Sequence, residues 1–338
     1  MENNANSLRD RANPVDGKLR RLFSVFAMIL LTVVLAGCSD DPGAEFRADA
    51  SLKVVATTAM IADAALHVGG EHVSVVALMG PGTDPHLYNA SAGDVARMRH
   101  ADVILYNGLH LEGKLDRVLE AVEQSKHIYA VAERIPEDLR LHASPGSSTY
   151  DPHVWFDVSR WRHVVDATEE AFVEIDPAHE ADYRLNASAF RDSLASLDAW
   201  IRDTLSVVPE RRRALITAHD AFAYFADAYG FEVHGLQGIS TVSEAGAGDM
   251  RRIADLIAER DIPAIFVESS VSSKAIEAVQ AAVRARDKQV KIGGTLFSDA
   301  MGLPGTPEGT YLGMVRHNVR TIVSSLMPDS ATVSTESE

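Results

Sequence analysis

One long helix is predicted by residues 176–208, DPAHEADYRLNASAFRDSLASLDAWIRDTLSVV. Apolar residues recur there at intervals of three or four, as on one face of a helix: Phe190, Leu194, Leu197, Ile201 and Leu205. Asp176 is expected to cap the helix with Pro177 in its first turn, and the pattern ends before Pro209. A helix of about 30 residues spans roughly 45 Å, which is long enough to cross two lobes.

Short β-branched runs alternate with helical patterns on both sides of this helix. Before it, strands are predicted at 52–58, 72–79, 102–107 and 127–132, with helices from Met60, from Ala92 and over 159–174. After it, strands at 213–218, 232–236, 264–269 and 291–297 alternate with helices from Asp220, Gly248, Ser273 and Thr310. Such alternation is typical of parallel sheets. The predicted fold class is α/β, with two lobes that each hold a mainly parallel sheet flanked by helices, joined by the long helix.

Length and composition agree with this division. The chain has 338 residues, more than one core usually accommodates. We expect an N-terminal lobe at 51–175, a linking helix at 176–208, a C-terminal lobe at 209–327 and a disordered tail at 328–338. Apolar residues make up 46% and charged residues 24%, as in ordinary globular proteins. The formal net charge is -16, and no basic cluster that could neutralise a run of phosphates follows residue 21, so nucleic acid is not an expected partner.

The N-terminus has the pattern of an export signal. Basic residues at 18, 20 and 21 precede an apolar run at 22–36, which closes in Leu35-Ala36-Gly37-Cys38. The run is shorter than the ~20 residues that a membrane span needs. The four closing residues resemble the lipobox of bacterial lipoproteins, which implies cleavage before Cys38 and lipidation of its thiol. An uncleaved signal anchor is the alternative.

Cys38 is the only cysteine, so disulfides are excluded. The polar residues 39–50 that follow it are expected to form a flexible tether, and the fold is expected to begin near Leu52.

The tripeptide Asp-Pro-His occurs twice, at 84–86 and at 151–153. Proline fixes its own backbone angle and restricts the residue before it, so His86 and His153 are expected to project from stiff loops. His219 follows the predicted strand 213–218 and opens a predicted helix, and Asp299 follows the strand 291–297. Ligands of open α/β sheets bind at the carboxyl ends of strands, so these side chains are expected to meet across a cleft.

Three imidazoles and one carboxylate suit a borderline divalent ion, with zinc or manganese as the best fit. Calcium and magnesium want mostly oxygen donors. Imidazoles bind metal only when neutral, so affinity is expected to fall as pH drops through about 6 to 7. Other roles stay open for each residue: His86 and His153 as hydrogen-bonded loop residues, His219 as a helix cap, and Asp299 in an Asx-turn.

Seven phrases resemble one protein family, the metal-binding solute-binding lipoproteins of manganese and zinc ABC transporters, also called cluster nine or adhesin-type lipoproteins. They are GTDPHLY (82–88), YNGLHLEGKL (106–115), DPHVWFD (151–157), TAHDAFAYFADAYG (217–230), IFVESSVS (265–272), GGTLFSDAMG (293–302) and GTYLGMVRHN (309–318). The resemblance runs from about Leu52 to Met327. It implies two α/β lobes joined by one rigid helix, with metal ligands at His86, His153, His219 and Asp299.

The resemblance also implies a function. A protein of this family is a monomeric solute-binding protein on the outer face of the cell membrane or in the periplasm. It captures one Mn2+ or Zn2+ ion between its lobes and delivers it to the membrane permease of an ABC importer. Manganese-selective relatives often have glutamate at the third ligand, where this chain has His219. Many zinc-specific relatives carry a histidine-rich loop before the second ligand. In this chain, residues 134–150 contain a single histidine, His142.

Two other functions are considered. A surface adhesin is a role sometimes attributed to the family. A metal-dependent hydrolase is opposed by four protein ligands and by the absence of H-E-x-x-H and G-x-S-x-G motifs, so no enzymatic activity is expected. The ten remaining histidines, including His110 and His317, are assigned structural roles. Glu268 is expected either to orient an imidazole or to be a buried structural carboxylate.

Overall fold

The computed structural model describes residues 46–123 and 126–327. The predicted export signal, the lipidation site Cys38, most of the tether and the tail lie outside the described residues. Within them, no helix is long and apolar enough to cross a membrane. We call residues 46–175 the N-terminal half and residues 209–327 the C-terminal half.

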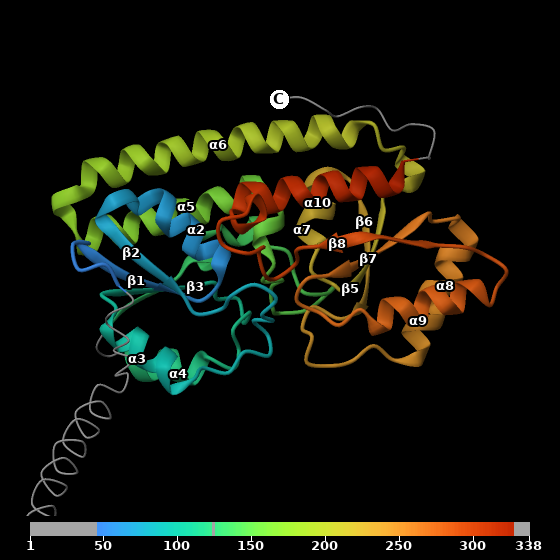
Figure 1. Ribbon diagram of the computed structural model, residues 1–338, viewed down its shortest axis with the longest axis horizontal. Coiled ribbons are helices and arrows are strands. Elements are labelled where there is room, and N and C mark those ends of the chain that lie inside the picture. The colour runs from blue at the N-terminus through green and yellow to red at the C-terminus, as the bar shows by residue number, and fades with distance from the viewer. Residues whose placement is uncertain (1–45, 124–125, 328–338) are drawn as a thin grey trace, which may run out of the picture. The chain divides into compact units, whose positions relative to one another are not determined.

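The N-terminal half contains one parallel sheet of four strands in the order β2-β1-β3-β4 (Figure 1). The strands are β1 (Leu52–Ala56), β2 (Val73–Ala77), β3 (Val103–Tyr106) and β4 (His127–Ala130). Four helices flank it: α2 (Ala59–Gly69), α3 (Ala92–His100), α4 (Asp116–Glu123) and α5 (Val158–Ile175). Alternate residues of β1 face opposite ways, so Val54 packs with α2 and α5, whereas Val55 packs with Met98 of α3 and Leu119 of α4.

The folded part starts earlier than the predicted Leu52. Phe46 is buried against the cluster that contains Val55 and Ile104. The backbone N–H of Arg47 donates to Oγ of Ser74 over 2.8 Å. The end of the predicted tether therefore packs onto the folded body, because the aromatic side chain of Phe46 is buried there.

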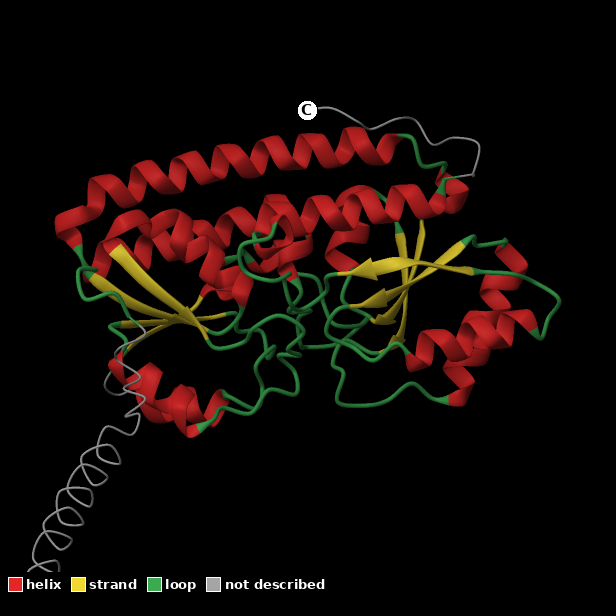
Figure 2. Ribbon diagram, viewed as in Figure 1, coloured by secondary structure: helices red, strands yellow, loops and turns green. Residues whose placement is uncertain are grey.

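The strands of the C-terminal half form two parallel pairs (Figure 2). The first pair is β5 (Ala214–His219) with β6 (Glu232–Gln237), and the second is β7 (Ala264–Glu268) with β8 (Lys291–Leu296). Their flanking helices are α7 (Ala223–Tyr229), α8 (Ala247–Arg260), α9 (Lys274–Arg284) and α10 (Tyr311–Leu326). The predicted α/β class with parallel strands and flanking helices is confirmed.

Two helix predictions need correction. The helix expected to open at Asp220 begins at Ala223, so His219 is the last residue of β5 and does not cap a helix. Helix α4 was not predicted, although its eight residues carry apolar side chains at helical spacing.

Helix α6 (Glu180–Ser206) is the predicted long helix. Its 27 residues span about 40 Å. The five apolar residues of the predicted stripe are buried, and Tyr183 and Ala187 extend it. Pro177 opens a short 3-10 helix before it, but the expected cap is wrong: the carboxylate of Asp176 accepts hydrogen bonds from Nδ1 of His179 and the hydroxyl of Tyr183 instead of backbone N–H groups.

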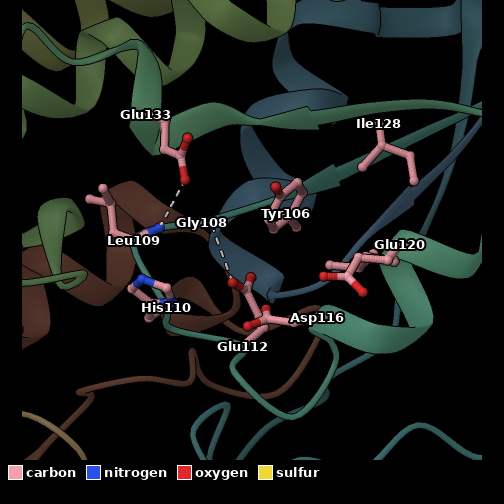
Figure 3. Close-up of a pocket in the computed structure, with 10 residues that line it drawn as sticks. Tyr106, Gly108, Leu109, His110, Glu112, Asp116, Glu120, Ile128 and Glu133 are labelled. Atoms are coloured by element: carbon pink, nitrogen blue, oxygen red, sulfur yellow. Dashed lines mark hydrogen bonds between the residues drawn. The ribbon is translucent and has the colours of Figure 1, made fainter. Parts of the chain in front are cut away.

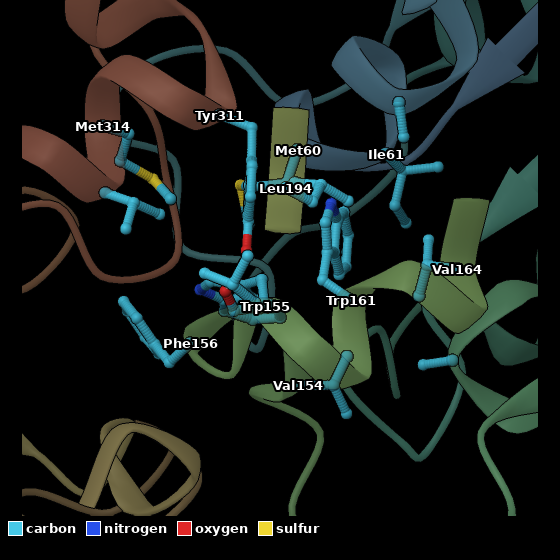
Figure 4. Close-up of a cluster of buried hydrophobic side chains, with 14 of the residues drawn as sticks. Met60, Ile61, Val154, Trp155, Phe156, Trp161, Val164, Leu194, Tyr311 and Met314 are labelled. Atoms are coloured by element: carbon cyan, nitrogen blue, oxygen red, sulfur yellow. The ribbon is translucent and has the colours of Figure 1, made fainter. Parts of the chain in front are cut away.

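One hydrophobic cluster includes residues of both halves and of α6 (Figure 4). At its centre the rings of Trp161 and Tyr311 stack with centroids 5.2 Å apart. The hydroxyl of Tyr311, from the C-terminal half, donates to the backbone oxygen of Trp155 over 2.7 Å. The two halves are therefore in direct contact just after the second Asp-Pro-His segment. The positions of the domain boundaries stay a prediction.

Candidate metal site

The structure brings the four predicted ligands together. His86 lies in the loop after β2, His153 precedes a short 3-10 helix at Val154–Phe156, His219 ends β5, and Asp299 lies in the loop after β8. One ligand atom from each residue lies within 4.8 Å of the others, and all four residues are buried. These loops gather between the two groups of strands (Figure 2). Among the described residues, this is the one group of His, Cys, Asp and Glu side chains close enough to hold a metal ion.

The separations fit a single small ion. The Nε2 atoms of His86 and His153 lie 3.2 Å apart. Asp299 oxygens lie 3.6 Å from Nε2 of His86, 3.7 Å from Nε2 of His153 and 3.2 Å from Nε2 of His219. Four ligands at roughly 2.05 Å around a tetrahedral zinc lie about 3.3 Å from one another. The four separations above, between 3.2 and 3.7 Å, are near that spacing, and all four ligand atoms lie within 4.8 Å of one another.

Several atoms that face the centre of this group have no hydrogen-bond partner. Among the described residues, neither oxygen of Asp299 nor Nε2 of His219 is hydrogen-bonded. A buried polar atom without a partner costs about 1–3 kcal/mol, and a charged one costs more. Because these atoms lie close together in the group, a cation placed among them would satisfy all of them.

A carboxylate stands behind two of the three rings. Nδ1 of His153 lies 2.7 Å from Oδ1 of Asp151, and Nδ1 of His219 lies 2.6 Å from Oε2 of Glu268. Each carboxylate also accepts the backbone N–H of the same histidine, over 2.9 Å in both cases. Such a partner sets the tautomer and leaves Nε2 free to face a metal. Glu268 therefore contacts the ring that it was expected to orient.

His86 is held differently. Oδ1 of Asp84 accepts its backbone N–H over 2.8 Å, and Oδ2 of Asp84 accepts the hydroxyl of Thr241 over 2.5 Å. In the described part of the chain, no carboxylate hydrogen-bonds to Nδ1 of His86. The Asp-Pro-His repeat contained the signal for Asp84 and Asp151, although the sequence analysis considered only its histidines. Nothing in the sequence pointed to Thr241.

Burial and charge give the three groups different proton affinities. Burial lowers the pKa of His86 to about 3, so this ring is neutral near pH 7. Burial also acts to lower the pKa of His219, but the nearby Asp299 and Glu268 carboxylates outweigh it and hold that pKa well above 6.5. Burial opposes ionisation of Asp299, yet the imidazoles, His219 first, keep its pKa below the usual range. Without metal, the site therefore holds a proton on His219 beside an ionised Asp299.

Another polar cavity, of 240 Å³, lies in the N-terminal half (Figure 3). It is lined by His110 and by the acidic residues Glu112, Asp116, Glu120 and Glu133. Burial raises the pKa of Glu112 to about 7, and its oxygens already accept hydrogen bonds from Thr57, Asn107 and Gly108. This carboxylate is engaged within the fold, so the cavity is not a candidate metal site.

The other histidine of a family-like phrase, His317, is also remote from the four. Its Nε2 lies 3.1 Å from the backbone oxygen of Thr295, and its ring packs edge-on against Phe297. These contacts fit the structural role expected for it.

Comparisons with known proteins agree with the fold and the site. Residues 54–325 match the protein family described as "Zinc-uptake complex component A periplasmic". The chain is 49% identical over 300 residues to the manganese-binding lipoprotein MntA of Bacillus subtilis, which covers 89% of this chain and 97% of that protein. It is 48% identical over 303 residues to the zinc-binding protein TroA of Treponema pallidum, covering 89% and 98%. The solved structure of that periplasmic zinc-binding protein superposes with a TM-score of 0.80 and 50% identity, covering 82% of this chain and 100% of that one.

Proposed function

This chain belongs to the family of zinc-uptake complex component A, and we propose that His86, His153, His219 and Asp299 are the ligands with which it captures its metal ion. It is an extracytoplasmic solute-binding protein of an ABC importer. Its cargo is a divalent transition metal, Mn2+ or Zn2+, which it delivers to the membrane permease.

One observation carries the ligand assignment. Three imidazole nitrogens and a carboxylate converge in a buried position, and the Asp299 oxygens and Nε2 of His219 have no hydrogen-bond partner among the described residues. In a protein that binds nothing, the charge of this buried carboxylate is balanced only by the proton on His219, whose Nε2 lies 3.2 Å from Oδ2, and part of the cost of its burial stays unmet. The cost is removed when a divalent cation occupies the centre.

Manganese and zinc both stay in the proposal. The two relatives described above are almost equally similar to this chain, and one is named for manganese and the other for zinc. Three imidazoles and one carboxylate accept either ion, so availability governs which one is loaded.

The charge state of the site suggests how loading proceeds. Near pH 7 His86 is already neutral and Asp299 is ionised, so both are ready to replace water on an arriving ion. His219 must first release the proton that its two carboxylate neighbours stabilise. Capture is therefore coupled to proton release, and we propose that docking of the permease displaces a ligand loop and returns the ion to water.

The remaining features follow from the same proposal. We propose that Cys38 carries a lipid anchor on the outer face of the cell membrane or in the periplasm, and that the chain acts as a monomer with lobes at 51–175 and 209–327. The family is a transport family, and we propose no catalytic role. Four protein ligands leave no open position where a metal would activate water.

Elemental analysis and competition titration of the soluble form that starts after Cys38 test the ligand assignment. The wild type is expected to bind one metal ion per chain, and His153→Ala is expected to lose it. His317→Ala is the matched control, because it removes a histidine that hydrogen-bonds elsewhere. Unchanged metal content in His153→Ala would remove the assignment.

A further inference from the structure

The loop between β6 and α8 has one buried residue in an exposed stretch. Thr241 is 7% exposed, whereas the neighbouring Ser240, Val242, Ser243 and Glu244 are exposed. The loop starts at Gly238, where an added Cβ would meet nothing within 4 Å. Thr241 is therefore buried by contacts with other parts of the protein and not by its neighbours in sequence.

What Thr241 contacts is the loop of the first proposed ligand. Its hydroxyl donates to Oδ2 of Asp84 over 2.5 Å, and Oδ1 of Asp84 accepts the backbone N–H of His86 over 2.8 Å. Two hydrogen bonds thus connect a loop of the C-terminal half to a ligand of the N-terminal half. The residues they join, Thr241 and Asp84, are 157 positions apart.

His86 depends on this connection more than the other histidines depend on theirs. His153 and His219 each have a carboxylate against Nδ1, which holds the ring from behind. The backbone next to His86 otherwise makes local turns, Leu87 to Asp84 and Tyr88 to Pro85, and accepts one hydrogen bond of 3.4 Å at Leu87 from Nζ of Lys114 in the same half. Among the hydrogen bonds of the described residues, the one from Thr241 is the one that ties this loop to the C-terminal half.

We propose that Thr241 is a clamp on the metal site, a positioning residue that keeps the His86 loop closed and slows dissociation of the ion. The inference rests on the proposed function, because it takes His86 as a ligand. When the Thr241 hydroxyl leaves Asp84, the His86 loop is free to move while the other three ligands keep their supports. The clamp is broken from outside, since the flanking residues of Thr241 are exposed.

The test is the dissociation rate of Zn2+, measured by stopped-flow mixing of the loaded protein with excess chelator. Thr241→Val keeps the shape of the side chain and removes the hydroxyl, and it is expected to speed dissociation about tenfold, the value of one hydrogen bond to a charged group. Thr241→Ser keeps the hydroxyl and is expected to restore the wild-type rate. Ser240→Ala is the matched control, because it removes a hydroxyl from the exposed neighbour.

Two further measurements keep the outcome decisive. In Asp84→Ala, adding Thr241→Val is expected to change the rate no further, since the acceptor is already gone. In metal-free protein, amide hydrogen exchange at 238–246 is expected to be faster in Thr241→Val than in Ser240→Ala, with no change in α6. Equal dissociation rates for Thr241→Val and Ser240→Ala would overturn the clamp. A wild type that binds no Zn2+ would overturn the proposed function, while the exchange comparison would still decide whether Thr241 holds the loop.

Discussion

The tripeptide Asp-Pro-His occurs twice in this protein and is used in two ways. In the second copy, Oδ1 of Asp151 accepts both the backbone N–H and Nδ1 of His153, and both side chains are fully buried. In the first copy, Asp84 accepts only the backbone N–H of His86 and turns its other oxygen to Thr241. Identical sequences thus produce one proposed ligand that its own segment supports and one proposed ligand whose loop is hydrogen-bonded to the other half.

The residues that follow the two copies also differ, because those after the second copy are more buried. The second is followed by the fully buried Val154 and then by Trp155, whose indole N–H donates to the backbone oxygen of Ser298, next to Asp299, over 3.0 Å. The first is followed by Leu87, which is 41% exposed. We therefore expect the second copy to be the fixed wall of the site and the first to be its movable side.

Removing each histidine in turn gives the largest expected effect. His153→Ala and His86→Ala are both expected to weaken Zn2+ binding by more than the roughly hundredfold that changes outside the ligand set produce. The loss is expected to be greater for His153→Ala, because its ring is part of the fixed wall. Competition titration measures both affinities. A smaller loss for His153→Ala would reverse the comparison.

Replacing Asp151 and Asp84 in turn tests whether the two Asp-Pro-His copies support their histidines in different ways. Asp151→Ala leaves the His153 ring without its partner and is expected to lower the equilibrium affinity for Zn2+ by about 10–100-fold. Asp84→Ala leaves all three rings with their side-chain contacts, so its main effect is expected on the dissociation rate. Titration and stopped-flow data on both variants check this. Equal affinities and equal dissociation rates for the two variants would show that both aspartates support their histidines in the same way.

The pH dependence of metal binding near neutral pH is expected to come from His219. The pKa of His219 is held well above 6.5, so below that raised pKa a proton competes with the metal, and affinity rises as pH rises. The slope is expected to be about tenfold per pH unit, ending where His219 is neutral in the metal-free protein. His86, with a pKa lowered to about 3, adds no slope near neutral pH.

This shifts the sequence-based expectation of a transition near 6 to 7 toward higher pH. Isothermal titration in buffers of different ionisation enthalpy counts the protons released per ion bound. Affinity that is flat from pH 5 to pH 8 would contradict ligation by His219.

The smallest expected effect concerns the packing behind each copy. Tyr311→Phe removes the buried hydrogen bond to Trp155 and is expected to lower the free energy of unfolding by about 1 kcal/mol. Tyr88→Phe removes a half-buried hydrogen bond to Asp94 beside the first copy and is expected to cost less. Urea denaturation of the metal-free proteins measures both. A larger cost for Tyr88→Phe would place the more rigid wall at the first copy.

Much of the fold was predictable because its signals are local. The stripe Phe190 to Leu205 has a helical period wherever it is placed, and strand β5 is an apolar run in any context. Helix α4 was missed although its apolar residues have helical spacing, whereas the burial of Phe46 was not predictable because one aromatic residue in a polar segment gives no sign of what it packs against. The division of the C-terminal strands into two pairs depends on their packing in space.

The sequence by itself determined the four candidate ligands, because strand ends, stiff Asp-Pro bonds and the chemistry of imidazole and carboxylate belong to short segments. Only the tertiary structure decided what stands behind each of them. Asp151 turns to its own histidine, Glu268 reaches His219 from β7, and Asp84 meets a threonine 157 positions away. Hydrogen bonds between distant segments form only when the fold has placed both partners, so no pattern along the chain records them.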